Sequence, residues 1–525
     1  MIQPSRGLVV ASWLCLAFAT MASRVPLNQT DVWLHLAFGT QWLDRGRLDP
    51  ADITPIALPG APGLNSYWLS QAAIAWAWTK GGVAGIQALH AAAIAIRLLA
   101  VAMLLKACGC ADRRLVLVMV VTIGLAIGHA PVFRPQVLAE LWAAPLLVLV
   151  LWPGHAWWPW LASGAVLGAW ALFHGSFLVG VALVLAAATG RALAGSHRAR
   201  RLMPPGGGMI ALAIAGALAV GLHPSGWNAL ADTLAMGANR AVRFQDEWQP
   251  LMANRSAVSK LLWVASLFWW AWAMAMAARR GHFPWACVAV GLPLALAPLW
   301  HQRFLVWWYL AAPILVARAF PPGEPREEET ELAAWQGWLG IGTGLAAAIA
   351  LCGPAMAWTN ALPDESLMAP ATPHAIAKAL RGAVQPMHSN QPGGRIFVSE
   401  SLGDYLAWSL GPRAPALLHS HVHLLPPEHY DACLTIKWAR PGWDRQLAAW
   451  GADLVLVEAM FHPRLRDGLA SHPDWIILRD DTPVANLDPR AKMLLAIRRE
   501  GSFAKVHNLM AVDPAGTAPQ GSPDP

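Results

Sequence analysis

Acidic, basic and histidine side chains stand at the edges of strongly apolar segments in this sequence of 525 residues. A carboxylate at such an edge can take a proton from an incoming hydroxyl group that it holds within hydrogen-bond distance. A guanidinium group can hold a phosphate through two parallel hydrogen bonds. The candidates for such chemistry are Asp31, His35, Asp52, Arg134, His174, His223, Glu247, His301 and Arg303.

Two aspartates are the candidates for acid–base chemistry. Asp31 directly follows the first apolar segment, where an acceptor from water could meet a lipid from a bilayer. Within Thr-Asp-Val-Trp it could equally cap a helix. Asp52, within Asp-Ile-Thr-Pro, could assist at the same place or make only a local bond in a proline turn. Both alternatives stay open for both residues.

Two arginines are the candidates for anion binding. Arg134 lies in Phe-Arg-Pro-Gln, beside a predicted helix start, and Arg303 lies in Trp-His-Gln-Arg-Phe. Each could bind phosphate, or could only extend its charged end to a membrane interface. Arg97 differs from both, because it falls in the middle of an apolar segment and therefore needs a partner among neighbouring helices.

The histidines are the weaker candidates. His174 precedes a glycine and a serine, so a ligand or another backbone could approach closely, although a hydrogen-bonded interfacial histidine explains it equally well. His223, Glu247 and His301 carry little signal alone. The histidines and carboxylates could together hold a divalent metal, but their spacing matches no metal motif, so the cofactor stays unknown.

The composition places these residues in a membrane protein. Hydrophobic residues make up 56% of the chain and charged residues only 13%, and there are thirty tryptophans, which favour membrane interfaces. The net charge of +7 does not indicate nucleic-acid binding, because the basic residues are scattered in short loops and form no stripe. The six cysteines lie mostly in or beside apolar segments and predict no disulfide framework.

Apolar segments long enough to cross a bilayer predict an α-helical polytopic membrane bundle of about eleven transmembrane helices. The first is interpreted as an uncleaved helix and not as a signal peptide. The predicted segments are 8–24, 83–106, 115–130, 136–152, 158–173, 176–190, 208–222, 261–277, 284–300, 304–319 and 337–357.

Basic loops predict the orientation of this bundle. If the N-terminus is cytoplasmic, the loops that carry most of the arginines all face the cytoplasm and the nine candidate residues all face outside. Those loops hold Arg113, Arg114, Arg191, Arg198, Arg200, Arg201, Arg279 and Arg280. The alternative is one long helix over 158–190, which would reverse the sidedness of everything after His174.

Residues 1–359 are predicted to form the transmembrane domain, with a structured first external loop over 25–82. Within that loop, 31–43 predicts a helix lying in the membrane interface, and 69–78 predicts a similar short helix. The pair Gly81-Gly82 then turns the chain into the membrane.

A soluble extracytoplasmic α/β domain is predicted over 360–510, before a disordered tail over 511–525. Apolar runs predict strands at 395–399, 452–457 and 475–478, and a helix at 403–410.

The order of several motifs resembles the GT-C superfamily of polytopic membrane glycosyltransferases, in particular a bacterial branch. The similar motifs are DVWLHLAFG (31–39), GRLDPADITP (46–55), Trp68-Leu69, FRPQ (133–136), Trp170 with His174-Gly175, EWQP (247–250) and RIFVSESLGDYL (395–406). The sequence departs from the branch at Tyr67, where relatives often have an acid, and at Leu172, where an asparagine is frequent.

This resemblance implies a glycosyltransferase of the bacterial cytoplasmic (inner) membrane, which takes sugar from a polyprenyl-phosphate carrier at the external face. Asp31 matches the acidic position that acts on the acceptor, and Asp52 matches a second acidic position that would position the acceptor or a metal. Arg134 and Arg303 would then bind the carrier phosphate, and His174 and His223 would line the sugar pocket. The alternatives are a transporter or lipid flippase, and a non-catalytic membrane protein of the same fold.

Overall fold

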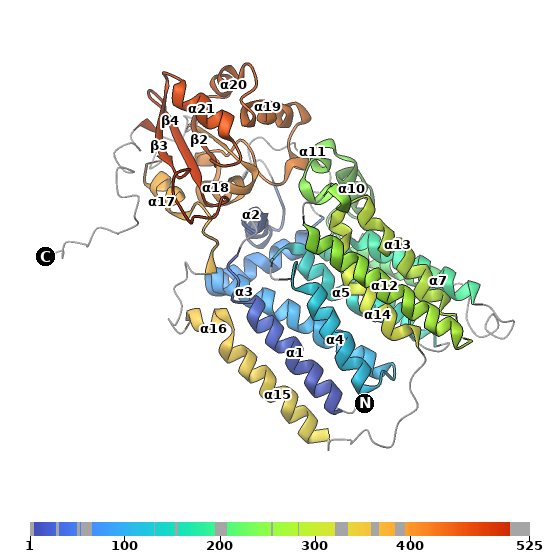
Figure 1. Ribbon diagram of the computed structural model, residues 1–525. Helices are drawn as coiled ribbons and strands as arrows, with labels where there is room; N and C mark the ends of the chain where they lie inside the picture. The colour runs from blue at the N-terminus through green and yellow to red at the C-terminus, as the bar shows by residue number, and fades with distance from the viewer. Residues whose placement is uncertain are drawn as a thin grey trace. The chain divides into compact units, whose positions relative to one another are not determined.

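The computed structural model describes residues 5–27, 31–49, 53, 66–130, 132–152, 156–194, 207–253, 256–281, 283–320, 334–358, 367–383 and 394–504 (Figure 1). Most of these residues are helical, and one small mixed sheet lies near the C-terminus. Contacts divide the chain into two compact units. The helical unit comprises Met1–Gln29, Phe38–Leu48 and Pro62–Met368, and the sheet unit comprises Thr30–Ala37, Asp49–Ala61 and Ala369–Pro525.

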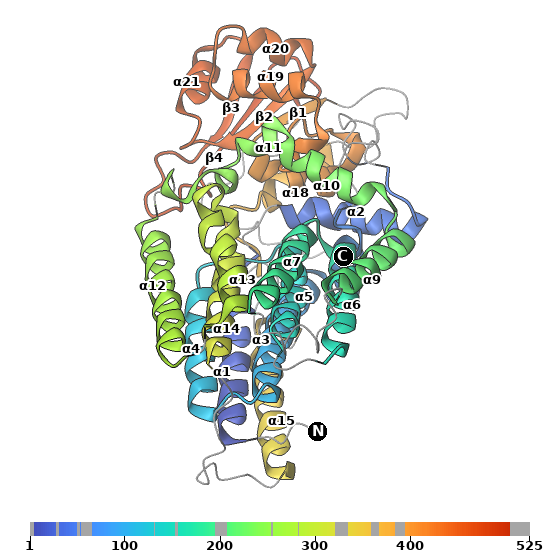
Figure 2. The same ribbon diagram turned by 90° about the vertical axis from the view of Figure 1, so that its right-hand side faces the viewer.

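Long apolar helices build the helical unit (Figure 2). They are α1 (Arg6–Ala22), α3 (Trp68–Ala107), α4 (Asp112–Ala126), α5 (Pro135–Val150), α6 (Trp158–Phe173), α7 (Phe177–Leu193), α9 (Gly207–Leu222), α12 (Ala257–Arg279), α13 (Trp285–Leu296), α14 (Leu305–Ala319) and α15 (Ala334–Leu351). Each predicted apolar segment is thus helical. Among the described residues, α3 and α12 are long and apolar enough to cross a membrane, and α1, α5, α6, α7, α9 and α13 are shorter apolar helices. The number of crossings stays a prediction.

Short elements connect these helices. They are α10 (Asn228–Ala238), α11 (Arg240–Arg243), η2 (Asp246–Trp248), η3 (Leu251–Ala253), η4 (Ala297–Leu299), η5 (Gln302–Phe304) and α16 (Gly353–Trp358).

Two predicted interruptions of helical structure are confirmed, at Gly81-Gly82 and at His174. Gly81 and Gly82 interrupt α3, and Gly82 has a φ of 56°, a conformation that glycine adopts without a steric penalty. His174 is extended, with φ −164° and ψ 138°, so α6 ends before it and α7 begins after it. The alternative of one long helix over 158–190 is therefore wrong.

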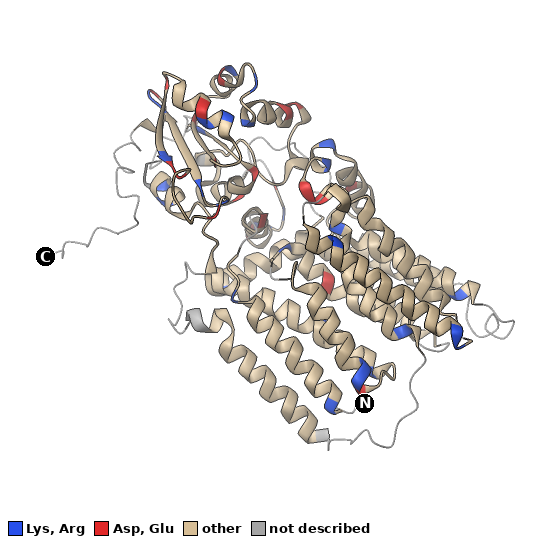
Figure 3. Ribbon diagram, in the orientation of Figure 1, with Lys and Arg blue, Asp and Glu red and all other residues tan. Residues whose placement is uncertain are grey.

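The described arginines of the basic loops gather at one end of the helical unit. Arg114 and Arg280 both stack on the Phe320 ring, at 5.3 and 5.2 Å from its centre. Arg191 donates to the Trp152 carbonyl at 2.9 Å, just after α5 ends. Figure 3 shows basic residues at the end of the bundle where α1 begins. This agrees with the predicted clustering, whereas the membrane side that it faces stays a prediction.

Arg97 of α3 forms an ion pair with Glu140 of α5, and only 2% and 3% of the two side chains are exposed. The sequence predicts a partner for Arg97 inside the bundle, and the structure identifies it. Removing either member alone would leave a buried charge uncompensated.

The sheet unit is built on a four-stranded sheet of order β1-β2-β4-β3. Strand β1 (Arg395–Val398) pairs in parallel with β2 (Ala452–Glu458), while β4 (Met493–Arg498) pairs antiparallel with β2 and with β3 (Trp475–Asp480). The helices of this unit are α17 (His374–Ala383), α18 (Glu400–Leu410), α19 (Pro427–Lys437), α20 (Trp443–Ala449) and α21 (Pro463–Ser471). The predicted strands and helix are confirmed, and β4 is an addition to them.

Helix α2 (Asp31–Arg45) confirms the helix predicted over 31–43. Its residues 31–37 group with the sheet unit and 38–45 with the helical unit. Trp33 of this helix is 2% exposed and packs against Tyr405 and Trp408 of α18, so the protein itself covers this ring. A ring that covers another protein surface cannot also face lipid.

Candidate functional site

Three charged residues of the candidate set come together in the helical unit. Arg134 Nη1 forms an ion pair with Glu247 Oε2, and Arg303 Nη1 lies 3.6 Å from Glu247 Oε1. Arg134 directly precedes α5, whose opposite end lies near Arg191, so this cluster lies at the end of α5 away from the basic loops. We call Arg134, Glu247 and Arg303 the arginine cluster.

Local structure explains how the cluster is held. Pro135 occupies the first turn of α5, where proline is favoured, and fixes the chain just after Arg134. Glu247 lies in η2 and Arg303 in η5, and hydrogen bonds join the two segments. His301 Nδ1 lies 2.5 Å from the Trp248 carbonyl.

A further backbone hydrogen bond runs from the Gln302 N–H to the Gln249 carbonyl at 2.8 Å. The Arg303 guanidinium stacks over the Trp248 ring, 4.2 Å from its centre. Main-chain bonds and the indole ring therefore fix the two segments in one arrangement before any ligand arrives.

The arginine cluster carries a net charge of +1, because two guanidinium groups face one carboxylate. Burial raises the pKa of Glu247, but the charges of Arg303 and Arg134 outweigh it and leave that pKa below its ordinary value. Glu247 is therefore ionised at neutral pH. The side chains of Arg134, Glu247 and Arg303 are 36%, 33% and 19% exposed, so the cluster is partly open to solvent.

His174 and His223 occupy equivalent local turns. The Nδ1 atom of His174 accepts a hydrogen bond from the Ser176 N–H at 2.9 Å, and that of His223 accepts one from the Ser225 N–H at 3.1 Å. An accepting Nδ1 places the proton of the neutral ring on Nε2. Both histidines are buried, and the His174 ring lies 4.7 Å from the ring of Tyr67.

Asp31 and His35 belong to the sheet unit. Asp31 is the first residue of α2, so it lies in the first helical turn and not at the cap position. The His35 ring packs edge-on against His421 at 4.5 Å. Burial, together with the nearby charge of His423, lowers the pKa of His35 to about 3, so the imidazole is neutral.

The nine candidates are therefore divided. Arg134, Glu247 and Arg303 come together, and His301 holds the loop beside them. His174 and His223 lie in separate turns of the same unit, and Asp31 and His35 belong to the other unit. Asp52 lies outside the described residues.

The sequence analysis missed Trp248, which stacks on Arg303, and the histidines beside His35. Trp248 could have been noticed in the motif EWQP, where this tryptophan directly follows Glu247. The histidines beside His35 could have been noticed in His-Ser-His-Val-His at 419–423, where three histidines stand at alternate positions. Neither partner could be assigned without knowing which distant segments meet.

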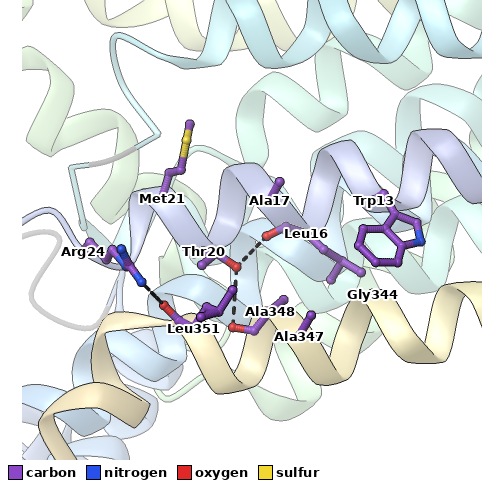
Figure 4. Close-up of a pocket in the computed structure, with 10 residues that line it drawn as sticks. All are labelled: Trp13, Leu16, Ala17, Thr20, Met21, Arg24, Gly344, Ala347, Ala348 and Leu351. Atoms are coloured by element: carbon purple, nitrogen blue, oxygen red, sulfur yellow. Dashed lines mark hydrogen bonds between the residues drawn. The ribbon is translucent and has the colours of Figure 1, made fainter. Parts of the chain in front are cut away.

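An apolar cavity of about 300 Å³ lies between α1 and α15 (Figure 4). The polar groups at its wall bond to the protein: the Thr20 hydroxyl donates to the Leu16 carbonyl at 2.8 Å, and Arg24 donates to the Leu351 carbonyl. Among the candidates that the structure describes, none lines this cavity.

Comparisons with known proteins support the fold. No protein-family model and no curated protein sequence matches the chain. Among solved structures, it is similar to the archaeal oligosaccharyltransferase AglB from Archaeoglobus fulgidus in complex with an inhibitory peptide and a dolichol-phosphate. The match covers 86% of this chain and 69% of that chain, with a TM-score of 0.50 and 13% identity.

It is also similar to ArnT from Cupriavidus metallidurans bound to undecaprenyl phosphate, over 94% of this chain and 97% of that chain, with a TM-score of 0.48 and 15% identity. Both neighbours are polytopic membrane glycosyltransferases of the GT-C superfamily. The similarity to AglB, at a TM-score of 0.50, confirms the predicted resemblance at the level of the fold alone.

Proposed function

We propose that this protein is an integral membrane glycosyltransferase, which moves a sugar from a polyprenyl-phosphate carrier to an acceptor at the external face of the bacterial inner membrane. The apolar helices of the helical unit and the GT-C fold support this class. The neighbour AglB, by its description, was solved with a dolichol-phosphate, which is a carrier of the same chemical kind.

The arginine cluster is the main structural support for this proposal. In sugar transfer the bond between the anomeric carbon and the phosphate oxygen breaks, and the departing carrier phosphate gains one negative charge. A fixed site with a net charge of +1 binds that phosphate more strongly as the bond breaks, and such differential binding accelerates a reaction. Trp248 and Glu247 hold the guanidinium groups in place beforehand, so little reorganisation is needed.

The remaining candidates keep the roles that the resemblance to the GT-C superfamily implies. Asp31 takes the proton of the acceptor hydroxyl as the new bond to the anomeric carbon forms, and Asp52 positions the acceptor or a metal. His174 and His223 offer N–H donors to sugar hydroxyl groups. His35 supports Asp31 one helical turn along α2, and His301 positions Arg303 through the Trp248 loop.

The transporter alternative depended on Arg97 as a charge in the middle of a span. That charge is paired with Glu140 and buried, so it serves packing and is no longer a specific sign of a transport pathway.

The test is transfer by the purified protein from a panel of polyprenyl-phosphate sugars to acceptors extracted from the cell envelope. Arg134→Ala and Arg303→Ala should each lower transfer at least tenfold and weaken binding of polyprenyl phosphate. Arg240→Ala is the matched control, because Arg240 is an exposed arginine of the same unit that stacks on Phe244. Unchanged transfer in both cluster variants would overturn the proposed site. An equal loss of transfer in Arg240→Ala would show that the effect is not specific to the arginine cluster.

A further inference from the structure

Three metal-ligand side chains converge inside the sheet unit. Asp404 belongs to α18, and His419 and His421 belong to the segment before α19. One ligand atom from each lies within 4.8 Å of the other two, and all three residues are buried. Two imidazoles and a carboxylate form a donor set that zinc and related divalent ions prefer.

His419 is the sharpest sign that a ligand belongs here. Its side chain is 0% exposed, and neither Nδ1 nor Nε2 has a hydrogen-bond partner among the described residues. A buried polar group without a partner is costly, and such groups are rare in native proteins. An imidazole nitrogen that bears no proton has a lone pair that a metal ion can accept.

Asp404 is oriented toward the same place by Ser420. The Ser420 N–H donates to Asp404 Oδ1 at 2.8 Å, and the Ser420 hydroxyl donates to Oδ2 at 2.6 Å. Asp404 is 0% exposed, and the carboxylates of Asp31 and Glu400 lie near enough to repel its negative charge. A bound cation would offset both the burial and the repulsion.

Ser420 also determines the tautomer of His421. The Ser420 hydroxyl donates its one proton to Asp404 Oδ2, so Ser420 Oγ accepts from His421 Nδ1, 3.2 Å away. The lone pair of His421 is then on Nε2. Such a hydrogen bond from the second nitrogen is the usual companion of a metal-ligating histidine.

Gly403 makes the convergence possible. A Cβ atom at this position would lie 2.0 Å from the Leu418 carbonyl oxygen, so only glycine lets α18 approach the chain this closely. Asp404 and His419, each the next residue along its segment, are thereby brought together.

We propose that Asp404, His419 and His421 bind one divalent transition-metal ion, with zinc the best match to their donor atoms. Tetrahedral zinc with bonds of 2.0–2.2 Å places its ligand atoms roughly 3.4 Å apart, so binding draws the three side chains inward by about 1 Å. The ring of His35 lies 4.5 Å and that of His423 5.7 Å from His421, and either imidazole or a water molecule completes the shell. His35 would link this ion to the helix that carries Asp31.

The test measures metal directly and needs no substrate. The full chain, purified with a tag free of histidine and freed of metal by a chelator, is titrated with Zn²⁺, Mn²⁺ or Mg²⁺ alone. Bound metal is measured by mass spectrometry, and affinity by competition with a chromophoric chelator. Wild-type protein should bind about one Zn²⁺ per chain, melt at a higher temperature with it, and discriminate against Mg²⁺, which prefers oxygen ligands.

Asp404→Asn and His419→Ala should abolish stoichiometric Zn²⁺ binding, and Ser420→Ala should weaken it by about 10- to 100-fold. His472→Ala, a histidine of the same unit outside the cluster, should leave binding unchanged. Wild-type protein that binds no Zn²⁺, or equal Zn²⁺ content in His421→Gln and wild type, would overturn the proposal. If a ligand variant fails to fold, Zn²⁺ binding by the wild-type protein and by Ser420→Ala still tests the proposal.

Discussion

Arg134 and Glu247 form an ion pair although 113 positions separate them in the chain, and Arg303 lies beside the second carboxylate oxygen. The Glu247 carboxylate therefore aligns two arginines, one just before α5 and the other just before α14. The alignment matters because guanidinium groups bind phosphate through directed N–H bonds and not merely through charge. Glu247 is thus expected to act by positioning the arginines.

Glu247→Ala should lower sugar transfer by about 10- to 100-fold, since a misplacement of about 1 Å in a binding group can cost two orders of magnitude. The measurement is the initial transfer rate in detergent or nanodiscs. Asp246→Ala is the matched control, because the neighbouring Asp246 is exposed and contributes to this loop through its main-chain carbonyl. Equal rates in wild type and Glu247→Ala would refute the positioning role.

The stability contributed by Glu247 should depend on pH only in acid. Its pKa in the folded protein lies below the ordinary 4.5, because Arg303 and Arg134 outweigh burial. The contribution is therefore complete above about pH 4.5 and is lost as the pH falls through the lower folded value. Since the pair is about one-third exposed, it amounts to about 1 kcal/mol or less. Melting temperatures of wild type and Glu247→Gln should differ equally at pH 5 and 7 and converge below pH 4; convergence at pH 6 would contradict this.

His174→Asn should distinguish the role of His174 in closing its turn from its proposed role in binding the sugar. An asparagine side-chain oxygen can accept the bond from the Ser176 N–H as the imidazole does, so the melting temperature should stay within about 2 °C of wild type. The Nε2 donor is lost, so transfer should fall at least tenfold. His174→Ala should lose both. Full activity in His174→Asn would show that the ring only closes the turn.

Gly39→Ala should destabilise the helical unit by about 1–3 kcal/mol, because the new Cβ would lie 1.9 Å from the Gln71 carbonyl oxygen of α3. Thermal unfolding followed by size-exclusion chromatography measures this. Gly216→Ala in α9 is the control, since a Cβ there meets nothing within 4 Å and alanine favours helices. A neutral Gly39→Ala would contradict the close approach of α2 and α3.

Arg97→Leu and Glu140→Leu should each destabilise the protein strongly, by about 3–5 kcal/mol, because each leaves one buried charge alone. The double variant should recover most of that loss, since a pair of leucines fills the space without charge. A double-mutant cycle of unfolding in detergent measures the coupling. Additive losses would show that the two residues act independently.

The helices of the helical unit could be predicted because their signal is local. Hydropathy over about 20 residues, glycine pairs and a break at His174 all lie within one segment. Strand β4 shows where local signals mislead: Met493–Arg498 contains Met, Leu and Ala, which favour helices, yet β2 and β3 pair with it on both sides. Tertiary pairing overrides the intrinsic preference.

The candidate site could be predicted only in its residue types. The sequence indicates that Arg134 and Arg303 suit phosphate, but not that both meet Glu247. It indicates that His35 is unusual, but not that it packs on His421, because such contacts depend on loops closing over hundreds of residues. Trp33 shows the same limit, since an amphipathic helix has one apolar face whether lipid or protein covers it.

The ion pair between Arg97 and Glu140 has a consequence for biogenesis. Helix α3 is synthesised before α5, so the arginine enters a bilayer ahead of its carboxylate, and a lone arginine at mid-span costs about 2.5–3.5 kcal/mol on insertion scales. The first helices must therefore stay together at the insertion machinery until residue 140 emerges.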